Sequence, residues 1–262
     1  MSFEWTAVAP QEAGRTGTKP LISLVVPVYN EEAAIGAFLD RMRPILWGET
    51  EAWEILFVND GSRDATLDIV RKASSSDARI RALDLSRNFG KEAALSAGLD
   101  HAMGHSIIVI DVDLQDPPEL IPEMLRLWQE GFEVVQARRA DRSTDRFLKR
   151  CTAAAFYRVI NALSSNAIPA NVGDYRLLDA KVVDALKRYG ERERFMKGIF
   201  AHVGFRTATI DYERAARYKG ETKFSFVSLA QLSIQGITSF SALPLKIWTY
   251  IGMLVAASGI LY

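Results

Sequence analysis

Five short apolar stretches, separated by segments with helical spacing, constrain the fold of this sequence more than any other feature. The stretches are LISLVVPV (21–28), EILFVND (54–60), IRALDLS (80–86), SIIVIDVD (106–113) and FEVVQAR (132–138). Each has the length of a strand and little alternation of apolar and polar residues, which is typical of strands buried on both faces. The sequence therefore predicts an α/β domain of the doubly wound type, with a mostly parallel sheet.

The segments between these strands favour helices. They are residues 31–46, 64–73, 91–102 and 117–130. In the first of them, Ile35, Phe38, Leu39 and Met42 recur on one side of a helix, so we expect this side to face the sheet.

After residue 138 the pattern changes. Residues 138–150 form a stretch rich in Arg and Lys, and a helical pattern follows to about residue 163. NVGDYRLLD (171–179) predicts a loop that enters a short strand, and a helix comes after it. FRTATIDYERA (205–215) alternates between apolar and polar residues, which predicts an edge strand or an antiparallel strand.

The two ends of the chain differ from this domain in composition. Residues 1–19 are rich in Gly, Pro, Thr and Ala and predict a flexible leader, so the α/β domain is expected to span residues 20–223. Residues 224–243 have amphipathic spacing, which favours a helix in the plane of a membrane interface. The alternative is a core helix of the α/β domain.

The last 19 residues, 244–262, contain Lys246 as their only charge. A helix needs about 20 apolar residues to cross a bilayer, and Trp248 and Tyr250 suit its interface. We therefore expect the start of a transmembrane helix, in a chain that is a piece of a longer membrane protein. A buried helix of a soluble domain is the alternative.

Charge and cysteine content narrow the class of protein. Lys and Arg together number 32, as do Asp and Glu, so no overall positive field favours nucleic-acid binding. Cys151 is the single cysteine and cannot form an internal disulfide. The three histidines are too scattered along the sequence to predict a zinc site.

Polar clusters follow four of the predicted strands. They are PVYNEE (27–32), NDGSRD (59–64), SRNFGKE (86–92) and DVDLQD (111–116). Ligands of open α/β sheets bind at the carboxyl ends of the strands, so four clusters there predict a shared crevice. Each cluster alone could be a turn or a helix cap, for example at Asn30, Asp64 or Ser86. No GxGxxG or GxxxxGK[ST] is present, which weakens dehydrogenase and nucleotide-hydrolase interpretations.

The DxD of Asp111 and Asp113 is the most chemically specific of these features. Alternation along a strand would place both carboxylates on one side of the strand end, with Gln115 beside them. Mg²⁺ and Mn²⁺ take oxygen ligands and often complete their shell with substrate phosphates. Asp116 and the two prolines after it are expected to start the following helix.

Six motifs together resemble a known family. PVYNE, VNDGS, SRNFGKEAAL, DVDLQDPPE, GDYRLLD and RYKGETKFS occur in the order seen in family-2 inverting glycosyltransferases of GT-A fold. The likeness covers about residues 20–250 and is greatest to the polyprenyl-phosphate branch, with its dolichol-phosphate mannose synthases and bactoprenol-phosphate glucosyltransferases. It implies transfer of a hexose from a nucleotide sugar to a polyprenyl phosphate, with Mg²⁺ or Mn²⁺ as cofactor.

The resemblance also implies a donor, a membrane and a place in the cell. Glucose from UDP-glucose is the preferred donor, while UDP-galactose, an aminosugar nucleotide and GDP-mannose stay open. The catalytic domain would lie on the cytoplasmic side of a bacterial inner membrane, and a homo-oligomer is compatible with a membrane anchor.

On the donor side, the resemblance implies a role for each matching residue. Those expected to bind the nucleotide sugar are Pro27, Tyr29, Glu31, Asp60, Lys91 and Asp111. Asp111, Asp113 and Gln115 would hold the metal on the diphosphate.

On the acceptor side, a lipid phosphate needs cations to hold it in line for attack. The candidates are Arg138, Arg139, Arg142, Arg146, Arg217 and Lys223. A solvated basic surface is the alternative for the outer members of 138–150. Asp113, Asp174 and Arg138 are the expected catalytic residues; Asp174 would orient the acceptor, assist proton transfer or brace an arginine.

Two other functions stay open. A family-2 enzyme could use a hydroxyl acceptor, although a QxxRW-like motif of polymerising synthases is missing. The chain could also be a non-catalytic module that binds nucleotide sugars at a membrane, but the retained Asp111, Asp113 and Gln115 set argues against it.

Overall fold

The computed structural model of the protein describes residues 22–139, 172–188, 204–213, 249, 251–253, 255–259 and 262. All the helices and strands described in the next two paragraphs belong to one compact unit of the chain. The described residues from 249 onward belong to a second unit, which is treated by itself.

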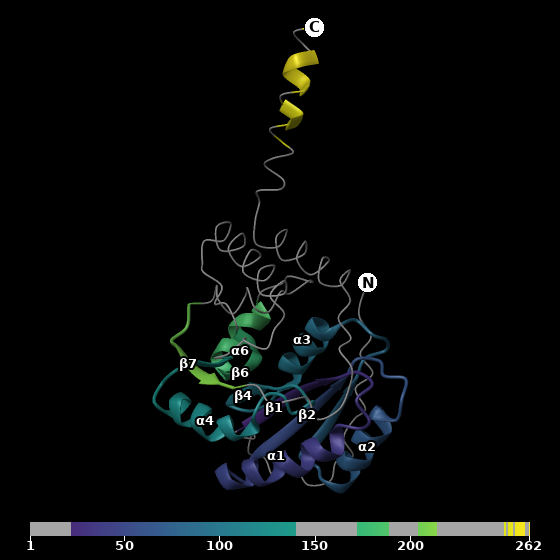
Figure 1. Ribbon diagram of the computed structural model, residues 1–262, viewed down its shortest axis with the longest axis vertical. Coiled ribbons are helices and arrows are strands. Elements are labelled where there is room, and N and C mark those ends of the chain that lie inside the picture. The colour runs from purple at the N-terminus through teal and green to yellow at the C-terminus, as the bar shows by residue number, and fades with distance from the viewer. Residues whose placement is uncertain are drawn as a thin grey trace. The chain divides into compact units, whose positions relative to one another are not determined.

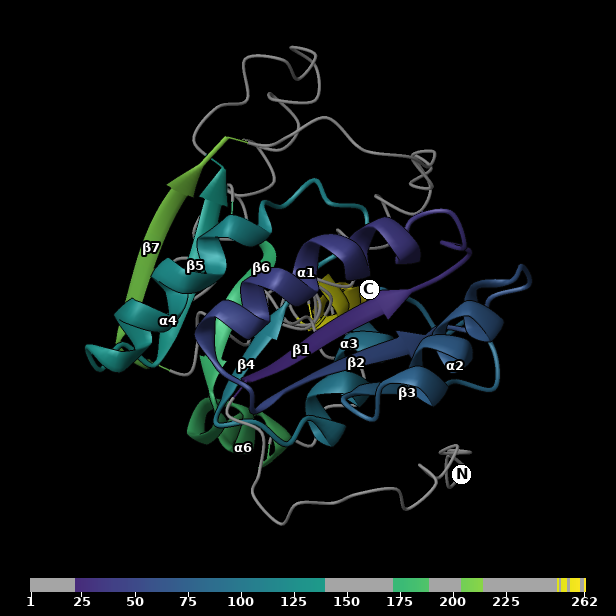
Figure 2. The same ribbon diagram turned by 90° about the horizontal axis from the view of Figure 1, so that it is seen from below.

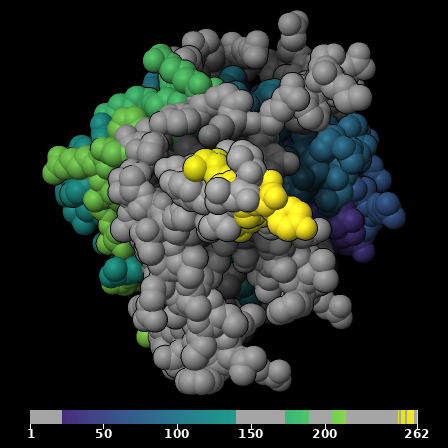
Figure 3. Space-filling model, turned by 90° about the horizontal axis from the view of Figure 1, so that it is seen from above, coloured from purple at the N-terminus to yellow at the C-terminus, as the bar shows by residue number. Residues whose placement is uncertain are grey.

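The first unit is built on a seven-stranded sheet (Figures 1 and 2). Its strands are β1 (Ile22–Val28), β2 (Trp53–Asn59), β3 (Ile80–Asp84), β4 (Ser106–Val109), β5 (Val134–Arg139), β6 (Val172–Asp179) and β7 (Thr207–Tyr212). They lie in the order β3-β2-β1-β4-β6-β5-β7. The space-filling view agrees, since blue residues and light-green residues lie at opposite margins of the coloured part (Figure 3).

Helices cover both faces of the sheet. They are α1 (Ile35–Glu49), α2 (Thr66–Ser76), α3 (Lys91–His101), the short 3₁₀ helix η1 (Pro118–Leu120), α4 (Ile121–Gln129) and α6 (Ala180–Arg188). Helices α1, α2 and α4 lie on one face, and α3 and α6 lie on the other (Figure 1). This arrangement confirms the predicted doubly wound α/β domain with a mostly parallel sheet.

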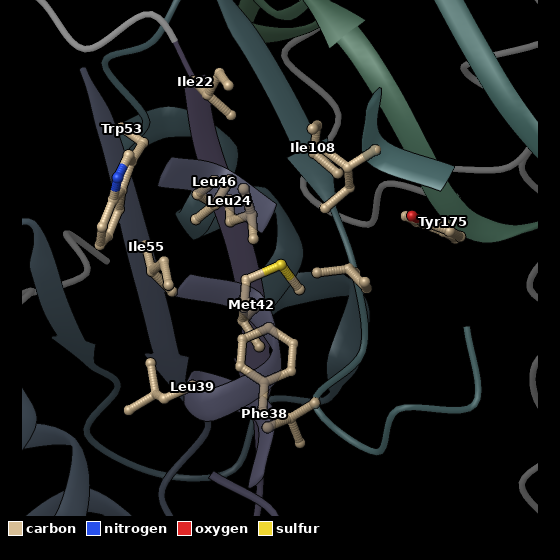
Figure 4. Packing of buried hydrophobic residues seen from close by; sticks show 14 of the residues in the cluster. Ile22, Leu24, Phe38, Leu39, Met42, Leu46, Trp53, Ile55, Ile108 and Tyr175 are labelled. Atoms are coloured by element: carbon tan, nitrogen blue, oxygen red, sulfur yellow. The ribbon is translucent and has the colours of Figure 1, made fainter. Parts of the chain in front are cut away.

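The core on the α1 side follows from the alternation of side chains along the strands. Ile22 and Leu24 of β1 point toward the same side as Ile55 of β2, and Phe38 and Met42 of α1 pack onto them (Figure 4). The four residues expected on the inner side of this helix are all buried, which confirms the predicted orientation of α1. Burying aliphatic and aromatic side chains at about 25 cal/mol per Å² is the main source of stability here.

On the opposite face, α3 approaches the sheet at a glycine. A Cβ atom built on Gly98 would lie 2.3 Å from Cγ1 of Val25 and 3.0 Å from Cγ2 of Val58. The missing side chain therefore lets the helix backbone lie close to β1 and β2.

The middle of the sheet differs from the sequence prediction. FEVVQAR was expected to close the parallel series, but β5 does not pair with β4, because β6 lies between them. Of the seven described strands, β6 alone runs antiparallel to its neighbours. The segment 205–215, predicted as an edge or antiparallel strand, is the edge strand β7 and pairs parallel with β5.

In the second unit, residues 249, 251–253 and 255–259 are helical, and Ile251, Met253 and Val255 are exposed. None of the helices in the described ranges has the length and apolar character that a bilayer crossing requires. Nine of the 19 residues in the predicted span 244–262 lie outside the described residues, as do the whole leader 1–19 and the whole helix 224–243. These three assignments stay predictions.

Candidate active site

Hydrogen bonds connect the polar clusters that follow β1 and β2. These clusters lie at the carboxyl edge of the sheet, the side at which the parallel strands end. The backbone N–H of Asn30 donates to Oγ of Ser62 at 2.9 Å, and Oδ1 of Asn30 accepts from the N–H of Arg63 at 2.8 Å. Asn30 has a φ of 51°, a left-handed conformation that asparagine tolerates better than most residues. It thus links two loops. Tyr29 and Glu31, beside it, are both partly exposed at this edge.

Asp60 fixes the loop that leads into α3. Its Oδ1 accepts from the N–H of Phe89 at 2.7 Å, and its Oδ2 accepts from the N–H of Gly90 at 2.9 Å. Burial raises the pKa of Asp60, although these two hydrogen bonds act in the opposite direction. A Cβ on Gly61 would lie 2.5 Å from the carbonyl carbon of Arg87, so the two loops touch through their backbones. The structure gives Asp60 a bracing role, and its contact with the donor stays a prediction.

Lys91, the first residue of α3, joins two acidic residues. Its Nζ lies 2.7 Å from Oδ1 and 2.8 Å from Oδ2 of Asp111, and 2.8 Å from Oδ2 of Asp174. Burial alone would lower the pKa of Lys91, but the two carboxylates outweigh it and raise the pKa well above its ordinary value. The ammonium group is therefore positively charged at neutral pH.

Strand register explains why Asp111 and Asp174 meet. In the antiparallel pair of β4 and β6, Val109 lies opposite Arg176. Asp111 comes two residues after Val109, and Asp174 comes two residues before Arg176. Both carboxylates therefore lie just past the end of β4, at the carboxyl edge. Asp174 was expected near the acceptor, and one of its partners at this edge is Lys91.

The DxD lies in a turn and not on a strand. Strand β4 ends at Val109, Leu114 has a φ of 55°, and the N–H of Gln115 donates to Oδ1 of Asp113 at 3.2 Å. The prediction that alternation along a strand aligns Asp111 and Asp113 is wrong, because an aspartate side chain here stabilises the turn through a local hydrogen bond. Both residues still follow the strand at the carboxyl edge.

Asp116 has a long-range partner. Its carboxylate accepts a hydrogen bond from the hydroxyl of Tyr212 on β7, and next to it the carbonyl of Pro117 accepts from the hydroxyl of Tyr175 on β6. The 3₁₀ helix begins at Pro118 without a side-chain cap. Asp116 is structural, as expected, and through Tyr212 it holds the turn to the edge strand β7.

A comparison with protein families identifies this arrangement. The family described as Glycosyl transferase family 2 matches residues 23–187, which contain the acidic turn, Lys91 and Asp174. The chain belongs to glycosyl transferase family 2.

Curated relatives of this glycosyltransferase cover most of its length. It is 51% identical to a prophage bactoprenol glucosyl transferase homolog of Escherichia coli K12 over 92% of the chain and 79% of the relative. It is 50% identical to a bactoprenol glucosyl transferase of Shigella phage SfV over 92% of the chain and 78% of the relative. An uncharacterised glycosyltransferase of Bacillus subtilis is 46% identical over 92% and 74%, respectively.

Solved structures show the same type of fold. Glucosyl-3-phosphoglycerate synthase of Mycobacterium tuberculosis, in a complex with Mn²⁺, UDP-glucose and phosphoglyceric acid, superposes with a TM-score of 0.55. The two sequences are 20% identical, and the match covers 84% of this chain and 78% of the synthase. At this identity the likeness concerns the fold alone.

Two basic residues of the glycosyltransferase lie at the end of β5. The guanidinium group of Arg138 pairs with Asp211 of β7, with Nε 2.6 Å from Oδ1 and Nη2 2.8 Å from Oδ2, and both side chains are half-exposed. Arg139 is partly buried at the last position of the strand. β5 runs antiparallel to β6, and Arg138 lies opposite Val172, the first residue of β6. Both arginines therefore lie near the start of β6, and Asp174 comes two residues after Val172. Arg142, Arg146, Arg217 and Lys223 lie outside the described residues.

Sequence reasoning missed Arg176, whose side chain is 2% exposed in the middle of β6. One of its terminal nitrogens donates to the carbonyl of Gly173. Burial lowers the pKa of Arg176 to about 10, while the charges of Asp174 and Glu92 act against this shift. The sequence did contain a signal for this residue, an arginine inside the otherwise apolar run YRLL. Because a buried charge needs a nearby opposite charge, such an arginine indicates an acidic group close to it in the fold.

The residues of the acidic turn fit a divalent ion that a substrate helps to hold. Asp111, Asp113 and Gln115 offer carboxylate and amide oxygens, the ligands that Mg²⁺ and Mn²⁺ prefer. Within the described part of the chain, no three His, Cys, Asp or Glu side chains are grouped closely enough to hold a metal by themselves. Lys91 already shows that Asp111 attracts a cation. The turn would thus provide part of a shell that diphosphate oxygens complete.

Proposed function

We propose that this glycosyltransferase transfers glucose from UDP-glucose to the phosphate of a polyprenyl phosphate, with inversion at the sugar carbon and with Mg²⁺ or Mn²⁺ as cofactor. The observation that carries the proposal is the identity of 50–51% to relatives named bactoprenol glucosyl transferase or its homolog, which extends over 92% of the chain. The cluster of Lys91, Asp111 and Asp174 at the carboxyl edge supports it.

The donor would lie along the carboxyl edge. Pro27 near the end of β1 and Tyr29 and Glu31 just after it would bind the nucleoside. Asp60 would hold the loop of Lys91 beside them. The N-terminus of α3 and the ammonium group of Lys91 both favour phosphate. Asp111, Asp113 and Gln115 would hold the ion, which when bound neutralises negative charge on the leaving diphosphate.

The acceptor phosphate would approach from the side of β5 and β6. A phosphate monoester carries its own negatively charged oxygen, so it needs orientation more than a base. Arg138 and Arg139 lie at this side of the edge and would hold that phosphate, together with Arg146, Arg217 and Lys223 from outside the described residues. Asp174 would keep Lys91 in position between the two substrates.

The membrane is the natural place for such an acceptor. Ile251, Met253 and Val255 expose apolar side chains in the helical residues after 248, which supports a contact with lipid. We propose that residues 224–262 anchor the protein at the cytoplasmic face of a bacterial inner membrane.

Labelled UDP-glucose tests this function. Purified full chain in detergent should transfer label to undecaprenyl phosphate with Mg²⁺ or Mn²⁺, and EDTA should stop the transfer. Undecaprenol, which has the same lipid but a hydroxyl in place of the phosphate, is the matched control acceptor. No labelled lipid from undecaprenyl phosphate would overturn the proposal, and label on undecaprenol instead would assign a hydroxyl acceptor.

The Asp113→Ala variant tests the metal assignment in the same assay. It should lose about 10²-fold or more of the turnover, the scale expected when charge stabilisation of the transition state is removed. Lys181→Met removes a lysine from the Glu133 ion pair and serves as the control that keeps full activity. Full activity of Asp113→Ala would remove this residue from the site.

A further inference from the structure

The ammonium group of Lys91 contacts both carboxylate oxygens of Asp111, the atoms that a metal on this residue would use. Its Nζ lies within 2.8 Å of both carboxylate oxygens of Asp111. Mg²⁺ binds carboxylate oxygens at about 2.0–2.1 Å and requires near-octahedral geometry. An ammonium group and a divalent ion on the same two oxygens would repel each other at close range. Lys91 and an ion held by these same two oxygens therefore exclude one another.

A second carboxylate allows Lys91 to leave Asp111 and to return to it. Oδ2 of Asp174 lies 2.8 Å from the same Nζ, so Lys91 keeps an ionic partner after it leaves Asp111. Without Asp174, that step would leave a partly buried charge unpaired, which is costly. Lysine suits the movement because its ammonium group sits on a flexible four-carbon stem.

The backbone under Lys91 is fixed while its side chain is long. The N–H groups of Phe89 and Gly90 are both bound by Asp60, and Gly90 has a φ of 97°, which favours glycine. The loop therefore holds the Cα of Lys91 in place, and a change of partner needs rotation of side-chain bonds only.

We propose that Lys91 is a placeholder cation: it holds Asp111 and Asp174 together before substrate binds, and it gives up Asp111 to the divalent ion when that ion arrives with the nucleotide diphosphate. Lys91 then stays on Asp174 and faces the phosphates. The proposal rests on the proposed function, because it requires a metal-bound nucleotide as donor. It assigns to Lys91 a positioning role in the order of binding, beyond contact with the donor.

The consequence is a coupling between metal and nucleotide. The ion alone must displace Lys91 without help, so it binds weakly. With a diphosphate present, the phosphate oxygens complete the metal shell and also attract the released ammonium group. Coupling between two ligands is reciprocal and typically amounts to about 5–150-fold in affinity.

Binding of Mn²⁺ to the full chain tests this inference without any turnover. Free Mn²⁺ is measured by electron paramagnetic resonance, first with MnCl₂ alone and then with MnCl₂ and UDP. Lys91→Met should bind Mn²⁺ without UDP about 10-fold more tightly than the unmodified chain, and UDP should improve its Mn²⁺ affinity less. Lys181→Met should behave like the unmodified chain. Lys181 pairs with Glu133, which directly precedes β5 and so lies at the amino ends of the parallel strands, opposite to the carboxyl edge.

Lys91→Arg provides a second measurement that keeps the charge. Its guanidinium can pair with a carboxylate through two parallel hydrogen bonds, so Mn²⁺ without UDP should bind no more tightly than to the unmodified chain. Tighter binding of Mn²⁺ by Lys91→Arg would overturn the inference. So would a Lys91→Met chain, shown to be folded by circular dichroism, whose Mn²⁺ affinity without UDP is unchanged or weaker.

The outcomes also separate this inference from the proposed function. If the unmodified chain binds no Mn²⁺ even with UDP, both the placeholder role and the proposed metal are wrong. If it binds Mn²⁺ as expected but transfers glucose to undecaprenol rather than undecaprenyl phosphate, the acceptor is wrong and the role of Lys91 stands.

Discussion

The hydroxyl of Tyr212 donates a hydrogen bond to Oδ1 of Asp116, 2.5 Å away, across 96 positions of sequence. Asp116 is 7% exposed and ends the turn that carries the DxD, whereas Tyr212 ends the edge strand β7. The ring of Tyr175 packs edge-on against the ring of Tyr212, with centroids 6.4 Å apart. The acidic turn is therefore attached to the part of the sheet that precedes the predicted acceptor segment RYKGETK.

Tyr212→Phe removes this hydroxyl and keeps the ring. A hydrogen bond to a charged group contributes about 1.5–3 kcal/mol, so the free energy of unfolding should fall by a similar amount. Urea denaturation followed by tryptophan fluorescence measures the change. Tyr212→Ala also removes the ring contact with Tyr175 and should be less stable still. Equal stability of Tyr212→Phe and the unmodified chain would contradict a stabilising role.

Gly98→Ala should destabilise the domain, because the new Cβ would lie 2.3 Å from Cγ1 of Val25. Overpacking of a close-packed core costs about 1–3 kcal/mol. Gly36→Ala is the matched control, since a Cβ on Gly36 in α1 would meet nothing within 4 Å. There alanine should stabilise the helix by about 0.5–1 kcal/mol. Thermal unfolding of both variants should move in opposite directions; a shift in the same direction would contradict the close packing of α3.

The pair of Asp77 and Arg79 predicts a pH-dependent contribution to stability. Oδ1 and Oδ2 of Asp77 accept from Arg79, whose guanidinium lies over the rings of Trp47 and Trp53, 4.1 and 4.3 Å from the centroids. Burial of Asp77 raises its pKa, but the bonds from Arg79 outweigh this and lower the pKa below its ordinary value. Folding therefore favours the charged form of this carboxyl.

Asp77→Asn should cost up to about 1 kcal/mol at pH 7. The pKa of Asp77 is lower in the folded than in the unfolded chain, so its contribution is present above the unfolded value, about 3.9, and is lost as the pH falls through the folded value. Urea denaturation at pH 7 and at pH 3 should give a stability difference between variant and unmodified chain that shrinks at the lower pH. A difference that is constant or grows on acidification would show that Asp77 acts in another way.

Arg138 and Asp211 can be distinguished by their effects on the acceptor. Arg138→Gln should raise the KM for undecaprenyl phosphate by about 10-fold or more, since it removes a cation from the proposed acceptor site. Asp211→Asn should leave this KM unchanged, because it frees Arg138 from the pair that the structure shows. Both variants should change the free energy of unfolding little, as is usual for exposed ion pairs. Equal effects of the two variants on KM would assign the pair a structural role only.

Local patterns were sufficient for most elements and insufficient for their order. The continuous apolar runs predicted β1, β2 and β3 because burial on both faces leaves a local mark in composition. The position of β6 between β4 and β5 leaves no such mark, since it depends on pairing between segments more than 30 residues apart. The end of β4 was placed four residues too late, because the turn at Leu114 takes a left-handed φ that leucine rarely adopts.

The same contrast between local pattern and long-range pairing applies to the residues of the site. Their types were predictable, because carboxylates and cations gathered at the carboxyl ends of parallel strands indicate a charged ligand. Their partners were not predictable: Lys91 meets Asp174 only because β6 enters the sheet beside β4. Arg176 was missed for the same reason, since its surroundings are created by that strand pairing.

The antiparallel strand β6 also has a consequence for biosynthesis. As the chain leaves the ribosome from its N-terminus, β1 to β4 can form a four-stranded parallel sheet, but one side of β4 stays unpaired until residues 172–179 emerge. During that interval β5 is already made and has neither of its partners, β6 and β7. An unpaired strand is a template for pairing with other chains. The nascent protein is thus most exposed to aggregation while the 30-odd residues between β5 and β6 are being synthesised.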